Sequence, residues 1–135
     1  MSKIKIQGNA SGTGTITLVS PVTDSSYTIP LAGGVLTLTD GATITPDFAE
    51  NTTFTVTLGG NRTMANPTNM VQGQTGSIFI VQDGTGSRTL AWGSYWDFIG
   101  GIAPTLTTTA NAVDRVDYIV RSAGSIHAVF TADYS

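Results

Sequence analysis

The sequence of 135 residues contains no cysteine, so it has neither disulfide bonds nor thiolate ligands for a metal. Charged residues make up only 11% of the chain, whereas they make up roughly a quarter of an average soluble domain. The six Lys and Arg residues are scattered and form no basic patch that could neutralise phosphates, so we expect no nucleic-acid partner. No apolar run approaches the roughly 20 residues of a membrane helix, and we expect no membrane partner either.

A secretion signal is also missing from the start of the sequence, because the two lysines within residues 1–9 have no apolar run behind them. We therefore expect a soluble protein made in a cytoplasm. What the sequence does contain is threonine, with 23 copies, and glycine, with 16. Threonine is β-branched and suits strands, while glycine supplies turns. Helical periodicity is nearly absent, so we predict an all-β fold.

Alternation of apolar and polar residues marks the expected strands. Residues 53–58 and 113–120 place large apolar side chains on one face and polar ones on the other. Residues 77–82 form a nearly continuous apolar run, which is typical of a strand buried on both faces. The pairs Asp83-Gly84 and Ala123-Gly124 stand where hairpin turns are expected.

The chain divides into two parts by its apolar content. Residues 44–135 carry enough apolar side chains to fold around themselves, and we predict a β-sandwich of jelly-roll-like form. Residues 1–43 carry few, while ordering each residue costs about 1–2 kcal/mol of backbone entropy. We therefore predict that residues 1–43 form an extended N-terminal arm of short strands. This arm must borrow a surface from its own domain or from a neighbouring subunit.

One short pattern recurs along the first half of the chain. The triplets Ile16-Thr17-Leu18, Leu36-Thr37-Leu38 and Val56-Thr57-Leu58 follow one another at intervals of about 20 residues. A period of about 20 residues can signal a β-solenoid. Because the repeat stops after three copies, we favour three similarly patterned strands and keep the solenoid as the alternative.

The sequence offers little for catalysis. His127 alternates with Ile126 and Ala128, so it faces away from the core and is expected at the surface or an interface. Asp114 and Asp117 are three residues apart on a strand and therefore point to opposite faces. We predict no catalytic, metal-binding or cofactor-binding residue, no small-molecule ligand and no enzyme activity. An acid pair assembled across a subunit interface stays open.

The densest cluster of aromatic residues comprises Trp92, Tyr95, Trp96 and Phe98. Exposed rings at this place would stack on sugars or anchor a protein partner. Buried rings would instead plug the end of a sandwich whose loops are rich in glycine. We favour the structural role for these rings.

Several stretches resemble known phage proteins. TLGGNRTMANPT at 57–68 and VQDGTGSRTLAWG at 81–93 are similar to a β domain of virion structural proteins of tailed bacteriophages. GNASGTG at 8–14, followed by LTL at 36–38, resembles an N-terminal segment of phage fibre and capsid-associated proteins. Such domains occur on capsid cement (decoration) proteins and on tail fibres, both usually trimeric.

The resemblance implies a virion structural protein, and our main hypothesis is a capsid cement protein. It would form a homotrimer on the capsid exterior and bridge neighbouring subunits of the major capsid protein, after assembly in the cytoplasm of a bacterial host. The alternative is a tail-fibre or adhesin module that binds a host-surface glycan through residues 92–98. In either case we expect the apolar groups of the arm and the ring cluster to form protein interfaces. These residues are Ile4, Ile6, Ile16, Leu18, Tyr27, Ile29, Leu36, Trp92, Tyr95, Trp96 and Phe98.

Overall fold

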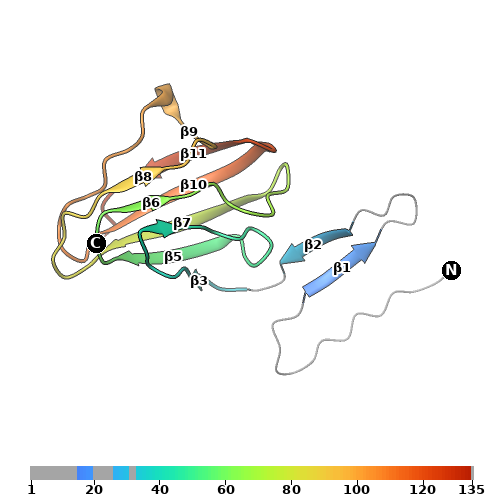
Figure 1. Ribbon diagram of the computed structural model, residues 1–135, viewed down its shortest axis with the longest axis horizontal. Helices are drawn as coiled ribbons and strands as arrows, with labels where there is room; N and C mark the ends of the chain where they lie inside the picture. The colour runs from blue at the N-terminus through green and yellow to red at the C-terminus, as the bar shows by residue number, and fades with distance from the viewer. Residues whose placement is uncertain (1–14, 20–25, 31–32, 135) are drawn as a thin grey trace.

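The computed structural model describes residues 15–19, 26–30 and 33–134, and this part of the chain is almost entirely β (Figure 1). The two-residue strands β3 and β4 begin the sandwich, and the longest strand, β10, lies inside its larger sheet. The elements are β1 (Thr15–Val19), β2 (Ser26–Pro30), β3 (Leu36–Thr37), β4 (Thr43–Ile44), β5 (Thr53–Leu58), β6 (Arg62–Met64), β7 (Thr75–Gln82), β8 (Leu90–Trp92), β9 (Trp96–Phe98), the 3-10 turn η1 (Ile99–Gly101), β10 (Val113–Ser122) and β11 (Ser125–Thr131).

The sandwich consists of a six-stranded sheet in the order β3-β5-β7-β10-β11-β9 and a three-stranded sheet in the order β4-β6-β8. From β3 to β8 the chain alternates between the two sheets. Within each sheet the successive strands pair in parallel. Each pair of strands, β3–β4, β5–β6 and β7–β8, therefore forms one coil stacked on the previous one.

This coiled arrangement refines the predicted fold. The all-β sandwich is confirmed, but jelly rolls are antiparallel structures, and these six strands are parallel within their sheets. The recurring triplets have a structural counterpart in this stack, since 36–38 and 56–58 fall in neighbouring coils. In the sheet, Leu36 lies opposite Phe54 and not opposite Val56. The strand pairing is therefore offset by two residues from the 20-residue interval between the triplets.

The last strands complete the larger sheet in a different way. β10 pairs antiparallel with both β7 and β11, and β9 adds to the outer side of β11 in parallel. The turn at Ala123-Gly124 connects β10 and β11, which confirms the hairpin expected there. The hairpin expected at Asp83-Gly84 is wrong. This pair begins a loop that leaves β7 for β8 in the other sheet.

The core lies between the two sheets and follows the alternation seen in the sequence. On β5, Phe54, Val56 and Leu58 are buried, whereas the threonines between them are not. β7 behaves in the same way, so the expectation of burial on both faces is wrong for residues 77–82. The largest fully buried side chains are Ile44, Phe48, Phe54, Val56, Leu58, Met64, Ile78, Ile80, Gln82, Val116, Val120 and Ile126.

The N-terminal part contains one element outside the sandwich. Strands β1 and β2 pair antiparallel with each other and with no other strand among the described residues (Figure 1). β3 belongs to the larger sheet, although the sequence placed residues up to 43 in the arm. The sandwich therefore begins by Leu36, and the independence of the remaining arm stays a prediction.

Candidate functional site

Three of the four rings predicted from residues 92–98 come together at the β8–β9 side of the sandwich, and the fourth, Tyr95, packs against the core. Trp92 lies edge to face with Trp96 and Phe98, at centroid distances of 5.2 and 4.9 Å. Trp96 is buried and also meets Phe48 and Tyr118 of the core edge to face. The cluster is thus continuous with the hydrophobic core.

Hydrogen bonds from one side chain and one backbone amide hold this cluster in place. The indole Nε1 of Trp96 donates to the carbonyl of Ala65 at 3.0 Å. The amide of Tyr95 donates to Oδ1 of Asn66 at 2.9 Å. The Nε1 of Trp92 is buried without a hydrogen-bond partner, so packing alone orients that ring. Of the four rings, those of Trp92, Tyr95 and Phe98 are half-buried.

An apolar surface that the sequence analysis did not single out lies directly after the cluster. Ile99 and Ile102 are 84% and 75% exposed and flank the turn at Gly100-Gly101. Both glycines have positive φ, of 71° and 69°, which other residues rarely adopt. The turn therefore projects two large apolar side chains, and the run Ile-Gly-Gly-Ile was the available sequence signal.

A shallow groove of about 170 Å³ lies beneath this turn, and we call it the apolar groove. Its walls come from η1 and the loop after it, and from β11, the strand next to β9. All of its lining side chains are apolar, in contrast to the threonine-rich faces elsewhere. The lining residues are Phe98, Ile99, Ile102, Pro104, Ala128, Val129 and Phe130.

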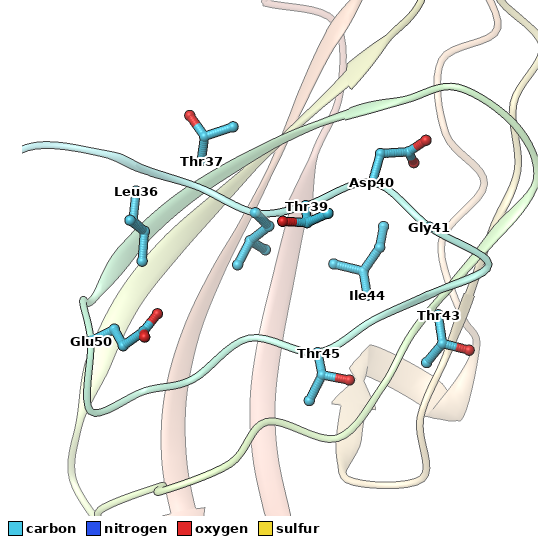
Figure 2. Close-up of a pocket in the computed structure, with 10 residues that line it drawn as sticks. Leu36, Thr37, Thr39, Asp40, Gly41, Thr43, Ile44, Thr45 and Glu50 are labelled. Carbon is cyan, nitrogen blue, oxygen red and sulfur yellow. The ribbon is translucent and has the colours of Figure 1, made fainter.

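A second, larger groove of about 370 Å³ opens at the other side of the sandwich, between β3 and β4, and we call it the edge groove (Figure 2). It is lined by β3, β4, the loop between them and Glu50. Figure 2 shows Leu36 and Ile44 reaching into the space between these strands, with Thr37 and Thr45 pointing away from it. Leu36 is half-buried against the core.

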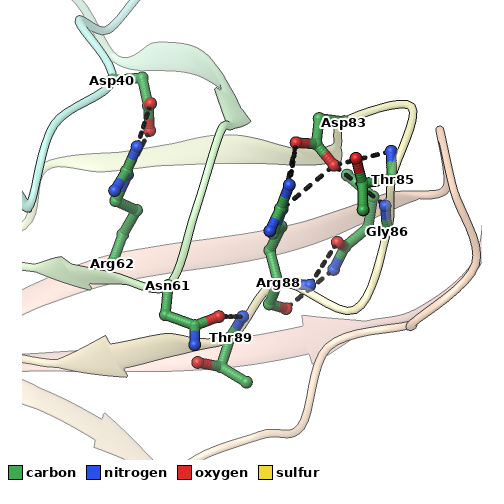
Figure 3. Close-up of polar contacts among 9 residues, drawn as sticks. Asp40, Asn61, Arg62, Asp83, Thr85, Gly86, Arg88 and Thr89 are labelled. Atoms are coloured by element: carbon green, nitrogen blue, oxygen red, sulfur yellow. Dashed lines mark hydrogen bonds and ion pairs between the residues drawn. The ribbon is translucent and has the colours of Figure 1, made fainter.

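Two ion pairs involve loops that connect the two sheets (Figure 3). The Arg88 guanidinium donates to both carboxylate oxygens of Asp83, at 3.1 Å or less, and lowers the pKa of Asp83 to about 2. The amides of Thr85 and Gly86 donate to the same carboxylate. These interactions close the loop between β7 and β8.

The second ion pair joins the first two coils. Arg62 on β6 donates to both oxygens of Asp40, at 2.8 and 2.6 Å, and lowers the pKa of that carboxyl. Because each carboxylate of the two ion pairs is matched by an arginine, neither resembles an acid or base poised for catalysis.

The remaining candidates for chemistry stay apart. His127 is exposed on β11, as its alternation with Ile126 and Ala128 predicts. Asp114 is buried and accepts from the amide and hydroxyl of Thr107, whereas Asp117 lies on the other face. Within the described part of the chain, no three His, Cys, Asp or Glu residues gather in a way that could hold a metal ion.

The predicted interface residues of the arm are only partly visible. Ile4 and Ile6 lie outside the described residues. Backbone pairing places Ile16 opposite Ile29 and Leu18 opposite Tyr27 in the β1–β2 hairpin. Leu36 lines the edge groove, far along the sheet order from the ring cluster on β8 and β9. The predicted residues thus fall into three separate places.

Comparison with known proteins gives one match. Residues 44–125 match the family described as "Putative phage tail fibre C-terminal domain". That region runs from β4 to the start of β11 and includes both the ring cluster and the Ile99–Ile102 turn. No curated protein and no solved structure matches the chain. None of the described helical segments is long and apolar enough to cross a membrane.

Proposed function

Because the chain belongs to the family of phage tail fibre C-terminal domains and is a phage structural protein, we propose that it is a tail-fibre module that attaches to the host surface. The family match is the observation that carries this proposal. The module acts by binding and not by catalysis. The described side chains that could serve as catalytic acids or bases are either held in ion pairs with arginine or lie apart from one another. Its ligand is a host-surface glycan.

The apolar groove is the surface that suits such a ligand best. Sugar rings present apolar C–H faces that stack on aromatic and aliphatic side chains. Phe98 forms one wall of the groove, and the exposed Ile99 and Ile102 project beside it. The groove, of about 170 Å³, has room for one sugar unit.

This location differs from the one expected from sequence for the adhesin alternative. That alternative relied on the whole run from Trp92 to Phe98, but Trp96 is buried and serves the core. Trp96→Ala would damage the fold and cannot test glycan binding. Phe98 and the two isoleucines are the appropriate probes.

The main sequence hypothesis, a capsid cement protein that bridges the major capsid protein, receives no support from the family match. The match instead favours the tail-fibre alternative. Gold-labelled antibodies against the chain, viewed on intact virions by electron microscopy, would distinguish them. We expect label on the tail, and label on the head would contradict our proposal.

Host attachment can be tested with the fluorescently labelled full chain. We expect it to bind host cells and to compete with phage adsorption. The double variant Ile99→Asp/Ile102→Asp should weaken binding about tenfold or more, as is typical when central apolar contacts are lost. The matched control Val71→Asp/Ile119→Asp changes two other exposed apolar residues and should bind normally.

Two results would contradict this assignment. Equal loss of binding in both double variants would show that added negative charge, and not the groove, is responsible. Failure of the wild-type chain to bind host cells or any sugar on a glycan array would remove host attachment altogether.

A further inference from the structure

The larger sheet ends at β3 with backbone groups that face outward. Leu38 donates its amide to the carbonyl of Thr55 on β5 at 2.8 Å. In a parallel ladder, alternate residues direct their N–H and C=O groups to opposite sides of the strand. Since Leu38 faces β5, the N–H and C=O of Thr37 face away from it. No described strand pairs with that side of β3.

The smaller sheet ends in the same way at β4. The carbonyls of Ala42 and Ile44 accept from the amides of Thr63 and Ala65, at 3.0 and 2.8 Å. Thr43, between them, therefore directs its N–H and C=O outward. β4 is the terminal strand of its sheet, and no described strand covers it.

These two open edges border one space, the edge groove, which is lined by both Thr37 and Thr43 (Figure 2). Leu36 and Leu38 line it as well and are only partly buried against the core. Val35, just before β3, is 51% exposed. The first coil of the sandwich therefore lacks the neighbour that β5 and β6 provide on its other side.

The same chain carries a β element without a neighbour. The β1–β2 hairpin pairs only with itself among the described residues. An isolated two-stranded hairpin is at best marginally stable in water. Its triplet Ile16-Thr17-Leu18 repeats the pattern of Leu36-Thr37-Leu38 on β3, so β1 has the composition of one more strand in the stack.

We propose that the β1–β2 hairpin of a second copy of this chain docks in the edge groove, with β1 adding to β3 as a parallel strand. Main-chain hydrogen bonds to Thr37 supply the pairing, as in other cases of strand addition. Each copy then gives one hairpin and accepts one. Such a head-to-tail exchange closes into a ring when the rotation between copies permits, and three copies make the trimer expected from sequence.

We assign the docked hairpin to a second copy because the hairpin of the same chain does not pair with β3 in the structure. Only residues 31–35 separate β2 from β3, and five extended residues span up to roughly 17 Å. Neighbouring strands lie about 4.8 Å apart, so the link is long enough for pairing within the chain. The structure nevertheless has no pairing between β1 or β2 and β3.

The first experiment removes the outward N–H of β3 without touching the β3–β5 ladder. In Thr37→Pro the proline lacks that N–H, and an edge position tolerates it. We expect the wild-type full chain to be a trimer by analytical ultracentrifugation and Thr37→Pro to be a monomer with an unchanged circular dichroism spectrum. The control Thr37→Ala keeps the N–H and should remain a trimer. A monomeric wild type, or an unchanged trimer in Thr37→Pro, would overturn the proposal.

A second experiment does not depend on how well Thr37→Pro folds. The chain has no cysteine, so Thr17→Cys/Thr37→Cys introduces the only two thiols. Oxidation should give covalent oligomers on non-reducing gels, because a disulfide joins Cα atoms about 4.4–6.8 Å apart. The control Thr17→Cys/Ala91→Cys places the second thiol on exposed β8 and should give none. A bond within one chain, or no bond, would contradict exchange between copies.

This inference rests on the open strand edges and the unpaired hairpin, and is independent of host attachment. The two proposals can therefore fail separately. Both proposals would be supported if Thr37→Pro is monomeric and still binds host cells, with lower avidity than the wild type. Loss of cell binding in Ile99→Asp/Ile102→Asp with an intact trimer would assign attachment to the apolar groove alone.

Discussion

At the scale of single residues, one glycine in β7 decides how closely two parts of the fold approach. A Cβ on Gly76 would overlap the carbonyl of Thr52 and the phenol ring of Tyr118. That phenol is itself fixed, since it donates to the Thr52 carbonyl at 2.9 Å, and burial raises the pKa of Tyr118. Neither neighbour can move without breaking this contact.

We therefore predict that Gly76→Ala lowers the free energy of unfolding by about 3 kcal/mol, at the upper end of the range for overpacking. Urea denaturation followed by tryptophan fluorescence measures this. The control is Gly84→Ala, at an exposed position where a Cβ meets nothing within 4 Å. Similar losses in both variants would show that glycine flexibility, and not the close approach, matters.

Asp83 gives a prediction about pH. Its pKa is lowered to about 2 from the ordinary 3.8, chiefly by the hydrogen bonds from Arg88. A carboxylate with a lowered pKa stabilises the fold above pH 3.8 and loses that contribution as the pH falls towards 2. Asp83→Asn should thus lower the melting temperature at pH 7 and flatten its fall below pH 4.

Melting temperatures followed by circular dichroism from about pH 7 to about pH 2 test this expectation. Thr85→Ala is the control, because it changes the same loop but leaves the carboxylate's side-chain and backbone donors in place. If Asp83→Asn kept the wild-type pH dependence, other carboxylates would have to carry it.

At the scale of elements, the long connection between β9 and β10 depends on two buried polar side chains. Gln82 donates to the carbonyls of Arg88 and Thr107 and accepts from the amide of Arg88, all within 3.0 Å. Asp114 accepts from the amide and hydroxyl of Thr107 at 2.8 and 2.7 Å. Thr107 is thus hydrogen-bonded to side chains of both β7 and β10. These bonds fix the irregular segment between β9 and β10.

We expect Gln82→Met to keep the packing volume but to leave three backbone groups without their partner. Each buried unsatisfied group costs about 1–3 kcal/mol, so the free energy of unfolding should fall by about 3 kcal/mol. Guanidinium denaturation measures it, with the exposed Gln72→Met as control. A loss below about 1 kcal/mol would mean that water replaces the side chain.

At the scale of the whole molecule, the two ends of the sandwich differ, although each has two terminal strands: β3 and β4 at one end, and β9 and β8 at the other. The β10–β11 hairpin extends the larger sheet beyond β7 with antiparallel pairing, and β9 is its last strand. Nothing described covers β3 and β4. We propose the β3–β4 end for assembly and the β9 side, with its apolar turn, for attachment.

Among the residues whose burial the structure describes, the buried core runs from Ile44 to Ala128, with Leu36 and Leu38 packed against it. We predict that deletion of residues 1–32 leaves a cooperatively unfolding monomer. Its melting temperature should lie within about 8 °C of that of Thr37→Pro, equivalent to roughly 1 kcal/mol in a domain of this size. Scanning calorimetry with ultracentrifugation tests this, and an unfolded fragment would mean that the arm belongs to the core.

The sequence by itself determined the all-β class, the inward faces of β5 and β10, the Ala123-Gly124 hairpin and the outward position of His127. These features follow from local alternation, which the period of a strand imposes on any fold. Only the tertiary structure decided which strands pair, because parallel partners such as Leu36 and Phe54 are distant in sequence. It also decided that Trp96 serves the core while Ile99 and Ile102 do not, since burial depends on the opposite sheet and not on the residue's own strand.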